Sequence, residues 1–321
     1  MLINRNLQLL RNLQSLGSYK KIKLPKHVNI MEVSPRDGLQ NEKKILTPES
    51  KIDFINMLTN AGIKSIEVGS FVSKKWVPQM ADSKNVFTCI NKKPDVNYFC
   101  LTPNQTGLET AMECNVKNIS VFSTASETFC RENINTSIIK NMKNLERIIK
   151  TALDNKINVR GYVSCIVNCP YEGFIEPKKV AQISKLLLDM GCSQVALGDT
   201  IGSATPNKIT NLLNQHLELG IDISKMAAHF HNTFGQGIVN AFVALSYGIN
   251  TFDGSVAGLG GCPYAPGASG NLPTEDLIYM LHGMGIETEI DIKKLALCGQ
   301  FICQKLGRSN ASNASQALYC Q

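Results

Sequence analysis

QVALGDTIGSATPNKITNLLNQHLELGIDISKMAAHFH, residues 194–231, is the stretch that decides the fold. It opens and closes with β-rich runs, at 194–200 and 225–231, and a helical pattern at 206–219 lies between them. Pro206 lies at the start of the expected helix, where a missing N–H costs little. Gly220 follows the helix, as C-terminal caps tend to. The stretch therefore predicts a strand, a crossover helix and a second strand.

The same alternation extends in both directions along the chain. Further strands are expected at 29–33, 65–71, 96–102, 118–124, 158–167 and 251–258. Helices are expected between them at 48–61, 76–91, 104–115, 136–155, 177–190 and 235–248, and after them at 274–284 and 291–305. Eight strands alternating with helices in about 250 residues predict an α/β fold, a parallel (β/α)8 TIM barrel with additional C-terminal helices. A doubly wound open sheet is the alternative, but no G-x-G-x-x-G motif follows the first strand to support a dinucleotide-binding fold.

Charge is distributed unevenly along the chain. The 321 residues include 33 basic and 26 acidic side chains, and they are 43% hydrophobic, which is enough for a large core. Six of the basic residues and no acidic residue lie within 1–28, so the remainder is close to neutral. A nearly neutral body argues against nucleic acid as a partner. The apolar stretches are too short and too interrupted to predict a membrane span.

The N-terminal segment has the composition of a targeting peptide. Leucines recur there at roughly helical spacing, together with Arg5 and Arg11. An amphipathic, arginine-containing leader without acidic residues is typical of a mitochondrial transit peptide. We therefore predict a targeting segment at 1–24, a catalytic domain at 25–321 and a place in the mitochondrial matrix. A disordered or surface helix in a cytoplasmic protein is the alternative.

Polar side chains gather at one rim of the expected barrel. In such barrels the chemistry takes place at the C-terminal ends of the strands. The loop after the eighth strand, GLGGCPYAPGASGN at 258–271, is rich in glycine and ends at the same rim. The side chains that the strands, their ends and this loop bring together are Arg36, Asp37, Glu67, Asp199, His229, His231, Cys262 and Asn271.

His229 and His231 point to the same side of their strand, because they are two residues apart. Two imidazoles on one face suit a divalent metal ion, although two unrelated histidines would give the same pattern. Asp37 would add a carboxylate oxygen and Asn271 an amide oxygen. This set of donors favours Mg²⁺ or Mn²⁺, with zinc as the alternative.

Arg36 allows two interpretations. It could neutralise the rim by pairing with Glu67 or Asp199, or it could stabilise a developing oxyanion while those carboxylates hold its planar fork. Glu67 is expected to be the orienting partner, because a carboxylate inside a barrel strand must be paired. Asp199 is expected to be a second orienting group or a base. Cys262, in a loop that could close over the mouth, could donate a proton to a carbanion or could simply be a packed thiol.

Five segments resemble the 3-hydroxy-3-methylglutaryl-CoA lyase family. They are EVSPRDGLQNEK (32–43), SFVSKKWVPQMAD (70–82), RGYVSCIVNCPYEG (160–173), LGDTIGSATP (197–206) and SVAGLGGCPYAPGASGN (255–271). The resemblance runs from about residue 24 to residue 306. It implies a carbon–carbon lyase that splits its CoA thioester substrate into acetoacetate and acetyl-CoA, in leucine breakdown and ketone-body formation. It also implies a homodimer.

The resemblance implies a role for each rim residue. The metal ligands would be Asp37, His229, His231 and Asn271. Arg36 would stabilise the enolate of the departing acetyl-CoA, and Cys262 would protonate it. Glu67 and Asp199 would support the site, and Asp199 or His229 would help to remove the hydroxyl proton. The substrate would also contact Gln40 and Asn133.

Two departures from the family pattern leave other functions open. Position 232 is Asn, where the family usually has Asp, and the Ser/Asn-rich tail after Arg308 matches poorly. One alternative is a condensing acyltransferase of the isopropylmalate, citramalate or homocitrate synthase type. Another is an inactive barrel kept as a binding subunit. The loop that contains Cys262 argues against the first, and the intact set of rim residues argues against the second.

Overall fold

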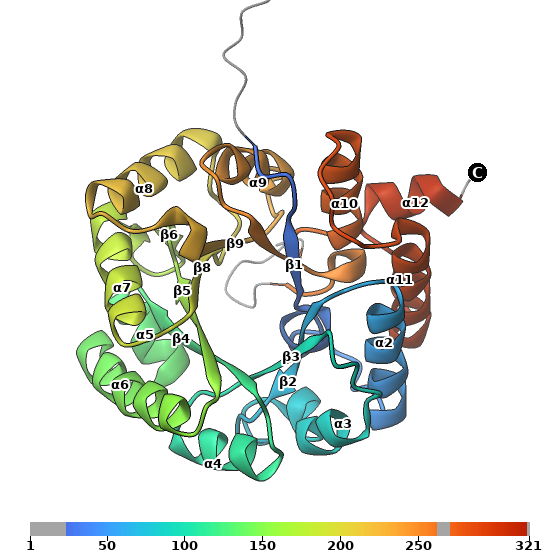
Figure 1. Ribbon diagram of the computed structural model, residues 1–321, viewed down its shortest axis with the longest axis horizontal. Coiled ribbons are helices and arrows are strands. Elements are labelled where there is room, and N and C mark those ends of the chain that lie inside the picture. Colours follow the sequence, from blue (N-terminus) through green and yellow to red (C-terminus); the bar gives the residue numbers. More distant parts are fainter. Residues whose placement is uncertain (1–23, 262–269, 320–321) are drawn as a thin grey trace, which may run out of the picture.

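The computed structural model describes residues 24–261 and 270–319 (Figure 1). Eight strands form a closed parallel barrel in which neighbours follow the chain order, with the last strand paired to the first. This confirms the predicted TIM barrel. The strands are β1 (Asn29–Glu32), β2 (Ser65–Ser70), β3 (Asn97–Leu101), β4 (Asn118–Thr124), β5 (Asn158–Ser164), β8 (Gln194–Asp199), β9 (Met226–Phe230) and β10 (Thr251–Gly254).

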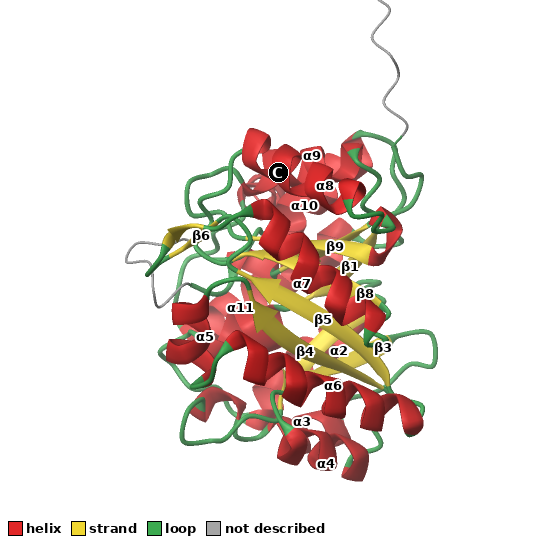
Figure 2. Cartoon of the chain, turned by 90° about the vertical axis from the view of Figure 1, so that its left-hand side faces the viewer, coloured by secondary structure: helices red, strands yellow, loops and turns green. Residues whose placement is uncertain are grey.

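Helices surround the barrel (Figures 1 and 2). The longest of those described, α6 (Ile138–Asp154), buries an apolar face that includes Leu145, Ile149 and Ala152, and Ser137 caps its first turn by accepting from Lys140 N. The remaining helices of the ring are α2 (Pro48–Asn60), α3 (Ser83–Cys89), α4 (Gln105–Glu113), α7 (Pro177–Asp189), α8 (Pro206–Glu218), α9 (Gly237–Ser246), α10 (Thr274–Gly283) and α11 (Ile292–Leu306). None of the described helices combines the length and the apolar surface that crossing a bilayer requires.

The apolar core and the barrel interior differ in character. The main hydrophobic cluster joins strand residues such as Ile66, Val121 and Val159 to residues of the surrounding helices. Inside the barrel, in contrast, Arg160 of β5 and Asp253 of β10 form an ion pair with 1% of each side chain exposed. A buried pair of charges requires good hydrogen-bond geometry to be tolerated. The barrel interior therefore holds a buried pair of charges in addition to apolar side chains such as Ala196 and Ala227.

Several elements differ from the sequence-based expectation, each for a local reason. The helix expected at 76–91 is a 3-10 turn, η2 (Pro78–Met80), followed by α3. The strand expected at 158–167 ends at Ser164, because Cys165 adopts a left-handed backbone with φ of 59°. We did not predict α5 (Glu127–Ile134) or the hairpin formed by β6 (Asn168–Cys169) and β7 (Gly173–Phe174).

The C-terminal tail forms a further helix, α12 (Asn313–Tyr319), beside α10 and α11 (Figure 1). Asp276 of α10 anchors its start, because Oδ1 accepts from Ser312 Oγ at 2.7 Å and from Ala314 N at 2.8 Å. Ala311 N donates to Ala257 O at 3.1 Å, in the turn that follows β10. The tail thus packs against the segment that leads into the glycine-rich loop.

Candidate active site

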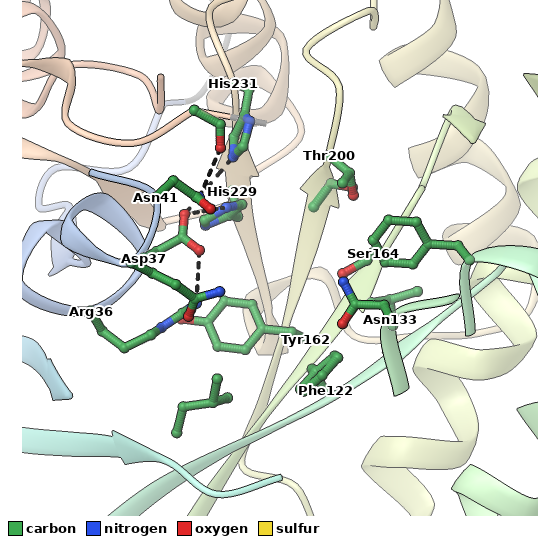
Figure 3. Close-up of a pocket in the computed structure, with 16 residues that line it drawn as sticks. Arg36, Asp37, Asn41, Phe122, Asn133, Tyr162, Ser164, Thr200, His229 and His231 are labelled. Atoms are coloured by element: carbon green, nitrogen blue, oxygen red, sulfur yellow. Dashed lines mark hydrogen bonds and ion pairs between the residues drawn. The ribbon is translucent and has the colours of Figure 1, made fainter. Parts of the chain in front are cut away.

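Arg36 and Asp37 lie on a short π-helical turn, η1 (Ser34–Gly38), directly after β1. The turn closes tightly, since the N–H groups of Arg36 and Gly38 both donate to Val33 O at 3.1 Å. Gly38 is required by packing: a Cβ there would lie 2.8 Å from Ser255 Oγ. The turn is thereby pressed against the segment after β10 and projects both charged side chains toward the cavity (Figure 3).

Two carboxylates hold the Arg36 guanidinium. Its Nε donates to Glu67 Oε2 at 2.5 Å, and its Nη1 donates to Asp37 Oδ1 at 2.7 Å. Burial works to lower the pKa of Arg36, but the two negative charges outweigh it and raise the pKa, so the fork is permanently cationic. Glu67 is fully buried and is the orienting partner that the sequence predicted. The remaining guanidinium surface lines the cavity.

Asp37, His229 and His231 form a candidate metal site. Asp37 Oδ2 lies 3.8 Å from His229 Nε2 and 4.0 Å from His231 Nε2, and one potential ligand atom of each residue lies within 4.8 Å of the others. Burial, reinforced by the neighbouring His229, lowers the pKa of His231 to about 4. His231 is therefore neutral at physiological pH, which is the form of imidazole that binds metal ions.

Asp253 fixes the orientation of His229. Its Oδ2 lies 3.1 Å from His229 Nδ1, and its two oxygens accept from Arg160 Nη1 at 3.1 Å and Nη2 at 2.5 Å. Burial works to raise the pKa of Asp253, but Arg160 and His229 outweigh it and lower the pKa, so Asp253 is an acceptor. Burial works to lower the pKa of His229, but Asp253 and Asp37 outweigh it and raise the pKa. In the neutral ring the proton belongs on Nδ1, which leaves the Nε2 lone pair facing Asp37. Carboxylates orient metal-binding histidines in this way.

Asn271 completes the donor set. Its segment pairs with the end of β9 and the residues that follow, through Asn232 N to Gly270 O at 3.1 Å and Leu272 N to Phe230 O at 2.9 Å. Asn271 Nδ2 donates to Asp37 Oδ2 at 2.8 Å, whereas Oδ1 is buried and has no hydrogen-bond partner among the described residues. A buried amide oxygen without a partner is costly, and a metal ion would satisfy it. The four side chains therefore fit a divalent cation.

A cavity of about 170 Å³ opens beside this cluster. One wall consists of Arg36, Asp37 and the two histidines, and the facing wall includes Asn133, contributed by α5 (Figure 3). Gln40, Asn41 and Gly261 also line the cavity, and Asn41 Nδ2 donates to Gly261 O at 2.9 Å. The remaining lining residues are Leu101, Phe122, Phe129, Tyr162, Val163, Ser164, Gly198 and Thr200.

The comparisons with known proteins agree on one family. A family model described as HMGL-like matches residues 27–302. The mitochondrial hydroxymethylglutaryl-CoA lyase of Pongo abelii is 48% identical over 315 residues, which cover 98% of this chain and 97% of that protein. The crystal structure of the Pseudomonas aeruginosa lyase has a TM-score of 0.90 at 46% identity and covers 92% of this chain and 99% of that chain. The chain belongs to the hydroxymethylglutaryl-CoA lyase family.

A second relative bears on the subcellular location. The cytoplasmic 3-hydroxy-3-methylglutaryl-CoA lyase of Danio rerio is 48% identical across 92% of this chain and 88% of that protein. Mitochondrial and cytoplasmic lyases are thus similar to this chain to the same degree. Residues 1–23 of the predicted targeting segment lie outside the described residues, so the subcellular location stays a prediction.

Not every predicted rim residue faces the cavity of this lyase. Asp199 Oδ1 accepts from Ser203 N at 3.2 Å and Oδ2 from Ala204 N at 2.8 Å, so the carboxylate holds its own loop. Burial raises the pKa of Asp199 to about 6. Asn232 has a local role as well, because its Oδ1 accepts from Gly237 N at the start of α9. Cys262, the predicted proton donor, lies outside the described residues.

Sequence reasoning missed three residues of this lyase site. Arg160 and Asp253 were placed in expected strands but received no role, although two opposite charges in buried strands are a signal that they pair. Tyr162 was not singled out either. Its ring centroid lies 4.7 Å from Arg160 Cζ and 5.8 Å from Arg36 Cζ, so it stands between the two guanidinium groups and lines the cavity.

Proposed function

We propose that this chain cleaves 3-hydroxy-3-methylglutaryl-CoA into acetoacetate and acetyl-CoA with the help of Mg²⁺ or Mn²⁺. The observation that carries the proposal is the Arg36 fork, held by Glu67 and Asp37 beside two histidines in one cavity. A cationic fork next to a metal site suits a reaction in which negative charge develops on a bound oxygen. The likeness to proteins named as this lyase, over nearly the whole chain, supports the choice of substrate.

The four predicted ligands would hold the cation: Asp37, His229, His231 and Asn271. When bound, a divalent cation acts as a Lewis acid that polarises oxygen atoms of the substrate. The chain's own part is to present the donors in the right protonation state. Asp253 keeps the His229 proton on Nδ1, and burial keeps His231 neutral.

This arrangement favours a ligand role for His229 over the alternative role of a base. With Nδ1 protonated toward Asp253, the ring offers a single lone pair, on Nε2. If that lone pair binds the cation, none is left to accept the proton of the substrate hydroxyl. Asp199 is turned to its own loop, so its role in the proposal is to support the segment that places Thr200 at the cavity.

Arg36 stabilises the charge that carbon–carbon cleavage generates. The proton of the C3 hydroxyl passes to solvent water in the cavity, the C2–C3 bond breaks, and its electron pair moves into the thioester as an enolate. Arg36 lines the cavity where that oxygen would lie, and Glu67 prevents the fork from turning away. A proton added to the enolate carbon then gives acetyl-CoA, and we assign its delivery to the Cys262 thiol.

Three further assignments belong to the proposal. Gln40 and Asn133 bind the substrate, which their positions in the cavity lining support. The chain acts as a homodimer. Its location is the mitochondrial matrix, which the acid-free leader and the mitochondrial relative support and which the cytoplasmic relative leaves open to correction.

The test is incubation of the purified chain with 3-hydroxy-3-methylglutaryl-CoA, with acetoacetate measured by a coupled reductase. We expect acetoacetate in the presence of Mg²⁺ or Mn²⁺, none after exhaustive chelation, and recovery when the cation is added back. Condensation of acetyl-CoA with a 2-oxo acid, without acetoacetate formation, would contradict the lyase and favour the acyltransferase. Full activity in chelator would contradict the metal site.

A further inference from the structure

Glu32, the last residue of β1, is fully buried and receives three hydrogen bonds from three separate segments. Oε1 accepts from Ser34 N at 3.0 Å and from Val256 N at 3.0 Å. Oε2 accepts from Thr274 Oγ1 at 2.7 Å. One carboxyl group thereby joins the turn η1, the short 3-10 turn η4 (Val256–Gly258) and the first residue of α10.

These three segments carry the two halves of the candidate metal site. Asp37 belongs to η1, five residues after Glu32 in the sequence. Asn271 lies on the return segment between η4 and Thr274. The two ligands, Asp37 and Asn271, are 234 residues apart in the sequence. Glu32 hydrogen-bonds to the backbone of the segment that carries Asp37, at Ser34, and to the backbone before the segment that carries Asn271, at Val256.

Close packing at the same place shows that the segments have little freedom to shift. A Cβ on Gly38 would lie 2.8 Å from Ser255 Oγ, and a Cβ on Gly254 would lie 2.6 Å from Thr274 Oγ1. Ala257, within η4, has a φ of 57°, which is costly for a residue with a side chain. Such a turn persists only when its surroundings hold it in place. Glu275 accepts from the N–H of Ala257 itself, and Glu32 accepts from the preceding N–H, that of Val256.

We infer that Glu32 is a positioning residue that sets the placement of Asp37 relative to Asn271, and thereby the affinity of the chain for a divalent cation. The inference deepens the proposed metal-dependent function and rests on it for its rate measurement. Glu32 acts through the length of its side chain and its three contacts. It does not act by placing a charge near the reacting atoms. Its contacts are to backbone N–H groups and to a hydroxyl, which an amide of the same length can also satisfy.

Two substitutions separate length from charge. Glu32→Gln keeps the length: its Oε1 can accept from both N–H groups, and its Nε2 can donate to the Thr274 hydroxyl. Glu32→Asp keeps the carboxylate but is one methylene shorter, so it cannot reach all three partners. Burial raises the pKa of Glu32 to about 7, which makes the neutral amide a close substitute near neutral pH.

The experiment measures Mn²⁺ affinity of the metal-stripped full chain by titration calorimetry, then the rate of acetoacetate formation. We expect Glu32→Gln to stay near the parent in both. We expect Glu32→Asp to lose about 10- to 100-fold in Mn²⁺ affinity, the size of loss that follows when the groups that orient metal ligands are removed. His216→Leu is the stability control. His216 is equally buried, but its ring contacts Leu212 O and Ser184 Oγ in the outer helices, so we expect a lower melting temperature with parental Mn²⁺ affinity.

Three results would overturn the inference. One is a Glu32→Asp chain that binds Mn²⁺ as well as Glu32→Gln does, or better. Another is parental affinity in both variants, and the third is an equal loss in His216→Leu. If Glu32→Asp does not fold, Thr274→Val removes a single contact, and unchanged Mn²⁺ affinity there would also overturn it. Absence of acetoacetate from the parent itself would contradict the proposed function alone, because the Mn²⁺ titration would still decide the role of Glu32.

Discussion

The two buried arginines of the barrel form similar ion pairs with different consequences. Arg36 lies at the mouth, is held by Glu67 and Asp37, and lines the cavity. Arg160 lies deeper, is held by Asp253, and is not part of the cavity lining. Tyr162 stands between them. The comparison teaches that the same pairing can serve the reacting atoms directly in one place and, through His229, indirectly in the other.

Arg160→Met should have the largest effect of the four substitutions below, and that effect should be on stability. It leaves Asp253 buried without its partner, and breaking a buried pair typically costs about 3–5 kcal/mol. Chemical denaturation of the parent and the variant measures this difference in the free energy of unfolding. The double variant Arg160→Met/Asp253→Asn should regain part of the loss. A single variant as stable as the parent would show that the deep pair is unimportant to the fold.

Arg36→Gln should have the next largest effect, and that effect should be on the rate. Charge develops on the thioester oxygen only as the bond breaks, so the guanidinium helps the transition state more than the bound substrate. Removing such a group typically costs about 10²–10³ in kcat, with little change in KM. Arg36→Lys should restore the rate only in part, because a point charge does not reproduce the fork. A near-normal kcat in folded Arg36→Gln would show that Arg36, like Arg160, has only a structural role.

Asp253→Asn should weaken metal binding as well as the fold, because it removes the partner of His229 and also leaves buried Arg160 without its carboxylate. The amide can present its NH₂ group to His229 Nδ1, which would move the ring proton to Nε2 and remove the lone pair that faces Asp37. The expected loss is about 10–100-fold in Mn²⁺ affinity. Calorimetric titration of the metal-stripped chain measures it. A Mn²⁺ affinity equal to that of the parent would show that Asp253 does not orient His229 for metal binding.

Glu275→Gln should have the smallest effect, visible in the pH dependence of stability. Burial raises the pKa of Glu275 to about 8, from an ordinary value near 4.5. A group with a raised folded pKa contributes stability that is present at low pH and lost as the pH rises through the folded value. The parent should therefore lose stability between pH 5 and pH 8, and the variant should lose less. Melting temperatures at four pH values test this, and equal slopes would contradict it.

Much of the fold could be predicted from sequence, because each β/α unit carries its own signals. Pro206 and Gly220 mark one helix, and the eight strands follow from the same alternation. Long helices and buried strands are specified locally by apolar periodicity. The features that escaped are those decided by distant contacts or by single backbone angles. Cys165, for example, ends a strand that its apolar neighbours Ile166 and Val167 would have continued.

The residues at the ends of the strands could be predicted as members of the site, because the strand ends of a barrel meet at one rim. Asp37, His229, His231 and Asn271 come together as expected, because the barrel topology alone brings their segments there. Glu67 pairs with Arg36, as its place inside a barrel strand predicted. The choice for Asp199 between a second orienting group and a base could not be read from the chain, because the N–H groups that it accepts from belong to the loop after β8.

The partner of His229 escaped for a related reason. Asp253 is 24 residues from His229 and 93 from Arg160. Asp253 and His229 are register partners on the neighbouring strands β10 and β9, and Arg160 of β5 reaches Asp253 through the barrel interior. Sequence can mark a buried charge as needing a partner, but it does not say which of several charges supplies it.

The most direct test of the central claim is the Mn²⁺ dissociation constant of Arg36→Gln, measured beside that of Asp253→Asn, with kcat determined on the same preparations. We expect a crossed result. Arg36→Gln should bind Mn²⁺ nearly as the parent does and lose its rate, whereas Asp253→Asn should bind Mn²⁺ weakly and recover rate as Mn²⁺ is raised to saturation. Parallel losses of affinity and rate in the two variants would contradict it, because the mouth and the deep pair would then be one structural unit.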